Sequence, residues 1–364
     1  MAKFNKKYLI ILILFITFTL INSNNFYYTK ADVIATQSNI KYTGKIEALS
    51  FTTLMSFPDK ALHENNSLSS NFDESKITVN EFKNILEELY INNYILVDIY
   101  DVIDRENMTK KDLYLPQNKK PIILTFDNVT YTSNYQNLGQ IDKIIIDRNN
   151  NLASYTTKKS IQDRIQYDNE FLLILENFIS KHKDFSYNNA RGIIFLTGEN
   201  GILGYNTNHK NASSKYEQKR VCEVIRKLKN LGWRFGSNNY TYKDESGKTD
   251  MEFAKELSLW NNEIKEIIGT TNLYAFPYGN YNKSNISKLE LLIANDFNIF
   301  FANNLDHDLS LHKDICFVLR KDVNGKNLRD NPKMYSQLFD AQKVYDHENR
   351  KINFEWIFLS ITAK

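Results

Sequence analysis

The chain has 364 residues, which is enough for one large or two ordinary domains, and its 42% hydrophobic and 24% charged residues are typical of a globular protein. Its 46 basic and 43 acidic residues give a net charge of +3, and the sequence has no dense Lys/Arg stripe with interleaved aromatic residues. No nucleic-acid partner is therefore predicted.

The amino-terminal segment has the pattern of an export signal. Residues 3–7 carry three lysines and precede an apolar run over residues 8–21. A bilayer-spanning helix needs about 20 apolar residues, so this run fits a signal peptide better. We expect residues 1–22 to be a signal peptide or an amino-terminal membrane anchor, with cleavage left open. The basic flank predicts that the remainder is extracellular or at the cell surface, and that only this segment contacts a membrane.

After a polar connector at residues 23–45, short apolar runs that predict strands recur along the chain. They lie at residues 48–54, 94–99, 122–126, 192–196, 233–237, 274–276, 299–302 and 317–320. A further pair of β-type runs around an Asn cluster, within residues 143–155, predicts a surface hairpin.

Segments with helical periodicity separate most of these strands. Thr78 and Glu81 form a capping-box pattern before the first of them, and we expect Asp168 and Asp250 to cap two later helices. Trp260 falls in an apolar helix stripe, which predicts a core position. Strands and helices that alternate in this way predict an α/β fold in which helices cover a parallel sheet of about seven strands. Periodicity alone leaves closure into a barrel open.

The two cysteines have no zinc-site spacing. Cys222 lies in a helical pattern and Cys316 beside an apolar strand, which favours two buried thiols. Whether they pair is left open.

Polar residues follow several of the predicted strands. The run at residues 121–126 ends in Asp127 and Asn128, and ligands of α/β proteins bind beyond the carboxyl ends of strands. The motif at residues 125–128, Thr-Phe-Asp-Asn, resembles the Thr-Phe-Asp-Asp motif of polysaccharide deacetylases, the NodB-homology family of carbohydrate esterases.

Two later segments extend this resemblance. Residues 235–242 stand in the place of the family's His-x-x-x-His motif, and residues 274–279 resemble its Pro-Tyr/Phe-Gly motif. The similarity covers about residues 48–330, so we expect a polysaccharide-deacetylase-like domain at residues 46–335 and a carboxyl-terminal segment at 336–364. The resemblance implies a distorted (β/α) barrel that hydrolyses the amide of N-acetylated sugars with a divalent metal.

Transferred by position, the resemblance gives Asp127 the role of general base. The positions of the metal ligands are Asn128, Asn238 and Tyr242, and all three depart from the family's Asp and two His. The family's frequent Arg is Ala275 here, and its late catalytic His has no convincing counterpart. We expect the groove to be lined by Asn128, Asn238, Asn239, Tyr242 and Tyr278.

The departures weigh against metal catalysis. An amide oxygen is a weaker ligand than a carboxylate, and a phenol with a pKa of ~10 is mostly protonated at neutral pH. A catalytic metal lowers the pKa of its bound water from ~15.7 to ~7, which reduces the free energy needed to form hydroxide by roughly 12 kcal/mol. Without the metal this contribution is lost. No cofactor is therefore predicted, and a zinc-type ion is expected only if the protein is an active enzyme.

Three functions remain open. The leading hypothesis is an exported, degenerate deacetylase that binds a cell-wall or extracellular polysaccharide with little or no catalysis. The first alternative is an active metal-dependent N-deacetylase of N-acetylglucosamine polymers. The second alternative is a non-catalytic scaffold in a surface assembly.

Overall fold

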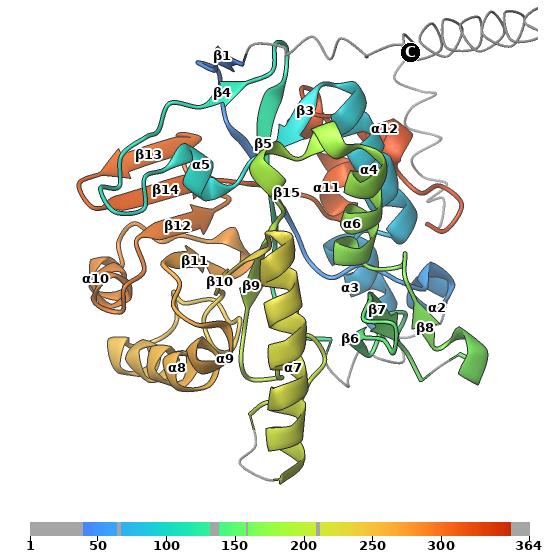
Figure 1. Ribbon diagram of the computed structural model, residues 1–364. Coiled ribbons are helices and arrows are strands. Elements are labelled where there is room, and N and C mark those ends of the chain that lie inside the picture. The colour runs from blue at the N-terminus through green and yellow to red at the C-terminus, as the bar shows by residue number, and fades with distance from the viewer. Residues whose placement is uncertain (1–38, 64–66, 132–137, 158, 209–211, 351–364) are drawn as a thin grey trace, which may run out of the picture. The chain divides into compact units, whose positions relative to one another are not determined.

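A computed structural model of the protein describes residues 39–63, 67–131, 138–157, 159–208 and 212–350 (Figure 1). The predicted signal or anchor and most of the predicted connector lie outside these residues. Within the described residues, we find no helix with the length and apolar character that a membrane crossing requires. The described residues from Lys41 onward belong to one compact unit.

The strands of this unit are short, and most of them belong to one sheet. In chain order the strands are β1 (Ile40–Lys41), β2 (Glu47–Phe51), β3 (Tyr94–Leu96), β4 (Tyr114–Leu115), β5 (Lys120–Phe126), β6 (Lys143–Ile146), β7 (Leu152–Tyr155), β8 (Ile165–Gln166), β9 (Ile193–Leu196), β10 (Arg234–Ser237), β11 (Leu273–Ala275), β12 (Ile299–Ala302), β13 (Leu309–His312), β14 (Ile315–Leu319) and β15 (Lys321–Asp322).

Helices connect the strands and cover the outside of the sheet (Figure 1). They are α2 (Pro58–His63), α3 (Ser67–Ser75), α4 (Val79–Ile91), α5 (Ile99–Val102), α6 (Phe171–Lys181), α7 (Ala212–Leu231), α8 (Asp250–Glu263), α9 (Lys265–Ile268), α10 (Ile286–Ala294), α11 (Gly325–Asp330) and α12 (Ala341–Val344).

The large sheet runs through parallel pairs in the order β2, β5, β9, β10, β11, β12 and β14. β3 pairs in parallel with the start of β5, and β13 pairs antiparallel with β14. After β14 the chain passes through Arg320 into β15, which pairs in parallel with β2. The sheet thereby returns to its first strand. The predicted distorted (β/α) barrel is confirmed.

Side chains of successive strand residues alternate between two cores, because a strand has a period of two. Leu124 and Phe126 of β5 face the helices and join the larger core with Phe82 and Phe171. Ile123 joins a second core inside the barrel, with Phe195, Ala275, Phe301 and Val318 from other strands. This alternation decides which residues at the strand ends face the interior.

Sequence predictions that depend on residues close together in the chain are confirmed. Thr78 and Glu81 form the predicted capping box of α4. β6 and β7 form the predicted hairpin at 143–155, with Lys143 opposite Tyr155. Trp260 is fully buried as expected, and its indole N–H donates to the carbonyl oxygen of Leu196 at 3.0 Å.

Two predicted caps are wrong. Helix α6 begins after Glu170, whose carboxylate accepts the N–H groups of Phe171 at 2.9 Å and Leu54 at 3.1 Å. Helix α8 is capped by Thr249, and Asp250 lies in its first turn. The residue that caps the helix lies two positions after the expected one in α6 and one position before it in α8.

The described part of the carboxyl-terminal segment packs onto the barrel. Leu338 and Val344 belong to the larger core. The buried guanidinium of Arg350 donates to both carboxylate oxygens of Glu81, at 2.6 and 2.7 Å. Both cysteines are free thiols, with Cys316 buried in the barrel interior and Cys222 partly buried.

Candidate functional site

The interior of the barrel changes from apolar to polar at the carboxyl ends of its strands. Alternation from the apolar interior residues predicts which side chains face inward there. These inward positions are Ser50, Thr125, Asp127, Thr197, Asn238, Asn303 and Arg320. Because parallel strands place their carboxyl ends at one edge, the polar residues form a single layer above the apolar core.

An ion pair between Asp127 and Arg320 lies in this layer. Arg320 donates from Nη1 to Oδ1 of Asp127 at 2.7 Å and from Nη2 to Oδ2 at 2.9 Å. The side chain of Arg320 is 0% exposed and that of Asp127 is 6% exposed. Two parallel N–H···O bonds make this the strongest arrangement of a guanidinium and a carboxylate. Both oxygens of the predicted general base are therefore engaged.

Two further contacts fix Arg320. Its Nη1 atom donates to the hydroxyl of Thr125 at 3.1 Å, and its Nε atom donates to the amide oxygen of Asn303 at 3.2 Å. Its guanidinium carbon lies 5.7 Å from the ring centre of Phe195. Sequence reasoning missed this residue. Its position in the sequence could have indicated it, because Arg320 follows the inward-facing Cys316 and Val318 with the same period of two. An Arg side chain buried in this way needs a partner.

Asn128 and Asn238, which stand at two predicted ligand positions, bridge strand ends. The backbone N–H of Asn128 donates to Oδ1 of Asn238 at 2.9 Å, and Nδ2 of Asn238 donates to the carbonyl oxygen of Ala275 at 2.8 Å. The hydroxyl of Thr197 donates to Oδ1 of Asn128 at 3.1 Å. These bonds tie together the ends of β5, β9, β10 and β11.

Tyr242 and Tyr278 lie beside each other at the same edge. Their ring centres are 4.8 Å apart with an angle of 46° between the planes. Tyr278 is 62% exposed, whereas Tyr242 is partly buried. Burial, followed by the charges of Asp127 and Asp322, raises the pKa of Tyr242 well above its ordinary value. Its phenol therefore stays protonated.

The backbone of this edge is strained. Asn128, Asn239, Tyr242 and Tyr278 all have positive φ, at 52°, 62°, 55° and 57°. Asn tolerates the left-handed region, but a bulky residue there is an outlier that the surrounding structure must enforce. Next to Tyr278, Gly279 has a φ of 67°, and a Cβ on it would lie 2.1 Å from Cγ of Asn303.

Asn239 does not lie where sequence reasoning placed it. It is fully buried, as is Asn238, so neither side chain faces an open groove. Its Oδ1 atom accepts the N–H of Tyr240 at 2.8 Å. Within the described residues, its Nδ2 atom has no hydrogen-bond partner. Of the predicted groove residues, Tyr278 is the most exposed.

A second carboxylate, Asp322, belongs to this edge and was also missed. It is partly exposed, and it accepts from Nδ2 of Asn324 at 2.6 Å and from the hydroxyl of Ser50 at 3.4 Å. Burial and the negative charge of Asp127 raise the pKa of Asp322 to about 6, while the Arg320 guanidinium opposes this rise.

These donors do not fit a zinc ion. Zinc is bound by thiolate, imidazole and carboxylate. At the three predicted ligand positions stand two amides, whose oxygens already accept protein hydrogen bonds, and one protonated phenol. Elsewhere in the described part of the chain, no group of three or more His, Cys, Asp or Glu is arranged to hold a metal.

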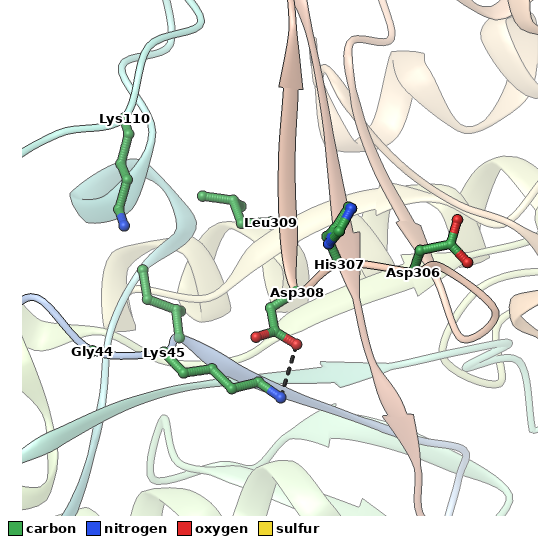
Figure 2. Close-up of a pocket in the computed structure, with 8 residues that line it drawn as sticks. Gly44, Lys45, Lys110, Asp306, His307, Asp308 and Leu309 are labelled. Atoms are coloured by element: carbon green, nitrogen blue, oxygen red, sulfur yellow. Dashed lines mark ion pairs between the residues drawn. The ribbon is translucent and has the colours of Figure 1, made fainter.

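A pocket of about 390 Å³ lies apart from these residues (Figure 2). It is formed beside the start of β2 and the loop before β13, and Lys45 and Asp308 form an ion pair of 2.8 Å in its wall. Its lining includes none of the strand-end residues described above.

Comparisons with known proteins agree with the sequence motifs. Residues 185–292 match the family described as polysaccharide deacetylase, a range that includes Asn238, Tyr242 and Tyr278 but not Asp127. The search of curated proteins gave no match.

Three solved structures are similar to this chain. The Streptococcus pyogenes deacetylase PplD, in complex with acetate, is 13% identical over 79% of this chain and 97% of its own, with a TM-score of 0.42. IcaB from Ammonifex degensii is 15% identical over 83% and 97%, with a TM-score of 0.43. BA3943 from Bacillus anthracis, a CE4 family pseudoenzyme, is 12% identical over 45% and 54%, with a TM-score of 0.26.

Proposed function

Residues 185–292 of this chain belong to the polysaccharide deacetylase family, and we propose that the protein binds a cell-wall or extracellular glycan at its strand ends without hydrolysing it. One observation carries the proposal. The amide oxygens at two predicted metal positions already accept hydrogen bonds within the protein: Oδ1 of Asn128 accepts from the Thr197 hydroxyl at 3.1 Å, and Oδ1 of Asn238 accepts from the backbone N–H of Asn128 at 2.9 Å.

The chemistry of amide hydrolysis supports a non-hydrolytic role. Water is a poor nucleophile at neutral pH, and a bound metal supplies roughly 12 kcal/mol by lowering the pKa of that water. Neutral amides and a protonated phenol do not supply this effect. Asp127 is held by a two-point ion pair with Arg320, which fixes its geometry and engages both of its carboxylate oxygens.

The exposed edge offers a surface that suits a sugar. The ring of Tyr278 is open to solvent and supported by the ring of Tyr242 at 4.8 Å. An aromatic face packs against the C–H face of a sugar ring. The two tyrosine rings pack on each other, which restricts their motion before the ligand arrives and lowers the entropic cost of binding.

Export completes the proposal. The basic and apolar pattern of residues 1–22 is that of a signal peptide or anchor. A protein outside the cell meets cell-wall and matrix polysaccharides directly, and the amino-terminal segment is the part proposed to contact the membrane.

Binding of glycan oligosaccharides by titration calorimetry tests this proposal. We expect Tyr278→Ala to weaken binding about tenfold, since an aromatic contact of this kind contributes about 1.4 kcal/mol. Tyr216→Ala is the matched control, because Tyr216 is 63% exposed on α7 and is not one of the strand-end residues described above. Absence of binding to any cell-wall or matrix glycan contradicts the proposal and favours the scaffold alternative.

A further inference from the structure

The charges at the strand ends do not balance. Asp127 is neutralised by Arg320 through both carboxylate oxygens. Asp322 has no ion-pair partner in the described part of the chain. The neighbouring Lys321 instead forms an ion pair of 3.0 Å with Glu47. An ionised Asp322 therefore leaves this edge with one negative charge in excess.

Asp322 is the carboxylate that a ligand can reach. Asp127 is buried, whereas Asp322 is partly exposed. The partners of Asp322, Ser50 and Asn324, are neutral donors and leave its charge uncompensated. Its field acts on Tyr242, whose ring packs on that of Tyr278. The partly exposed carboxylate of Asp322 and the exposed aromatic surface thus belong to the same edge.

We infer that this site recognises a hexosamine that carries a free amine, with its ammonium group at the Asp322 carboxylate and its ring on Tyr278. The inference rests on the proposed function and names the class of glycan, a polymer from which N-acetyl groups have been removed. It goes beyond that function, because a glycan-binding site of this fold does not by itself distinguish acetylated from free amines.

The chemistry separates this ligand from two others. A divalent cation requires several oxygen ligands, and a single carboxylate among neutral donors makes a poor site for it. An N-acetyl group is neutral and gives Asp322 no opposite charge. An ammonium is compact, carries three donors and needs only one carboxylate. The chain as a whole carries a net charge of +3, so non-specific attraction of a cationic polymer is not expected.

The pH dependence of binding follows from the groups around Asp322. Burial and then the charge of Asp127 raise the pKa of Asp322 to about 6, against the opposing charge of Arg320, and the phenols of Tyr242 and Tyr335 also lie within its field. Below that pH the carboxylate is protonated and loses its attraction for an ammonium. Affinity for the free amine is therefore expected to rise as the pH increases from 5 to about 6, where the amine of the sugar is still protonated, whereas affinity for the acetylated sugar is expected to change little.

Titration with two matched ligands, a hexamer of N-acetylglucosamine and a hexamer of glucosamine, tests the inference. We expect the full chain to bind the glucosamine hexamer about tenfold more tightly at pH 7, the ratio that 1.4 kcal/mol produces. Asp322→Asn is expected to abolish this preference while it keeps the shape of the side chain. Asp314→Asn, an exposed residue in the turn between β13 and β14, is the control and is expected to leave the preference unchanged.

The outcomes separate the inference from the function on which it rests. If neither hexamer binds, and no other glycan does, the proposed function fails. If the acetylated hexamer binds equally well or better, glycan binding stands and the inference is overturned. A preference for glucosamine that persists in Asp322→Asn also overturns it, because the selectivity then arises elsewhere. Thermal melting of each variant confirms that the fold is kept.

Discussion

Removal of the Arg320 side chain is the most informative perturbation of this barrel. Arg320→Met keeps an unbranched side chain but leaves Asp127 as a buried carboxylate without a partner. It also removes the donors to Thr125 at 3.1 Å and Asn303 at 3.2 Å. Breaking a buried ion pair by removal of one partner costs about 3–5 kcal/mol. We expect a loss of about 4 kcal/mol in the free energy of unfolding.

The two buried charges of this pair are expected to depend on each other for their effect on stability. Asp127→Asn alone leaves Arg320 with an unpaired buried charge, so we expect a loss of similar size. The double variant Asp127→Asn/Arg320→Met contains neither charge. It is expected to be destabilised by at least ~2 kcal/mol less than the sum of the single variants.

Urea unfolding at pH 7, followed by the fluorescence of the buried Trp233 and Trp260, measures these values. Arg320→Lys serves as a control, because it keeps the positive charge and loses the two-point geometry. A cost below ~1 kcal/mol for Arg320→Met, or costs that simply add in the double variant, would refute the claim that the pair is a buried, mutually dependent unit.

Two further predictions concern buried polar groups. Asn238→Ala removes the bonds to Asn128 and Ala275 and is expected to lower the unfolding free energy by about 2–3 kcal/mol in the same assay, and a cost near zero would mean that the bridge is not formed. Glu170 is fully buried, and burial raises its pKa to about 7 against the opposing effect of hydrogen bonds from Phe171 and Leu54. Because the folded state holds this proton more tightly than the unfolded state, stability is expected to fall by about 2–3 kcal/mol as pH rises from 4.5 to 7, and Glu170→Gln should flatten this fall. An unchanged pH slope in the variant counts against that assignment.

Periodicity and local chemistry were enough to predict most of the fold. The capping box at Thr78, the hairpin at 143–155 and the core position of Trp260 depend on partners close in sequence or on a clear helical stripe. The alternation of strands and helices likewise predicted the parallel sheet. These signals are local, so a single sequence carries them.

Features set by distant partners were not predictable in the same way. The cap of α6 shifted from Asp168 to Glu170 because the Glu170 carboxylate also accepts the N–H of Leu54, more than a hundred residues away. Closure of the barrel depends on the pairing of Lys321 with Leu49, which no periodicity indicates.

In the candidate site, too, the motif residues were predictable and the contacts between distant segments were not. Motif positions identified Asp127 and the two asparagines at the strand ends. They did not reveal that Asn238 is fully buried as a bridge, or that Arg320, between β14 and β15, reaches across to Asp127. Both facts depend on the register of strands that are distant in sequence, although the inward position of Arg320 after Val318 was a usable signal.

The central claim is that the strand ends bind glycan without a hydrolytic metal. Its most direct test measures bound zinc and acetate release together, on the chain without residues 1–22, with an N-acetylglucosamine hexamer in zinc-supplemented buffer. We predict no stoichiometric zinc after dialysis and no acetate release that a chelator abolishes. One tightly bound zinc per chain together with chelator-sensitive acetate release would contradict the account and establish an active deacetylase.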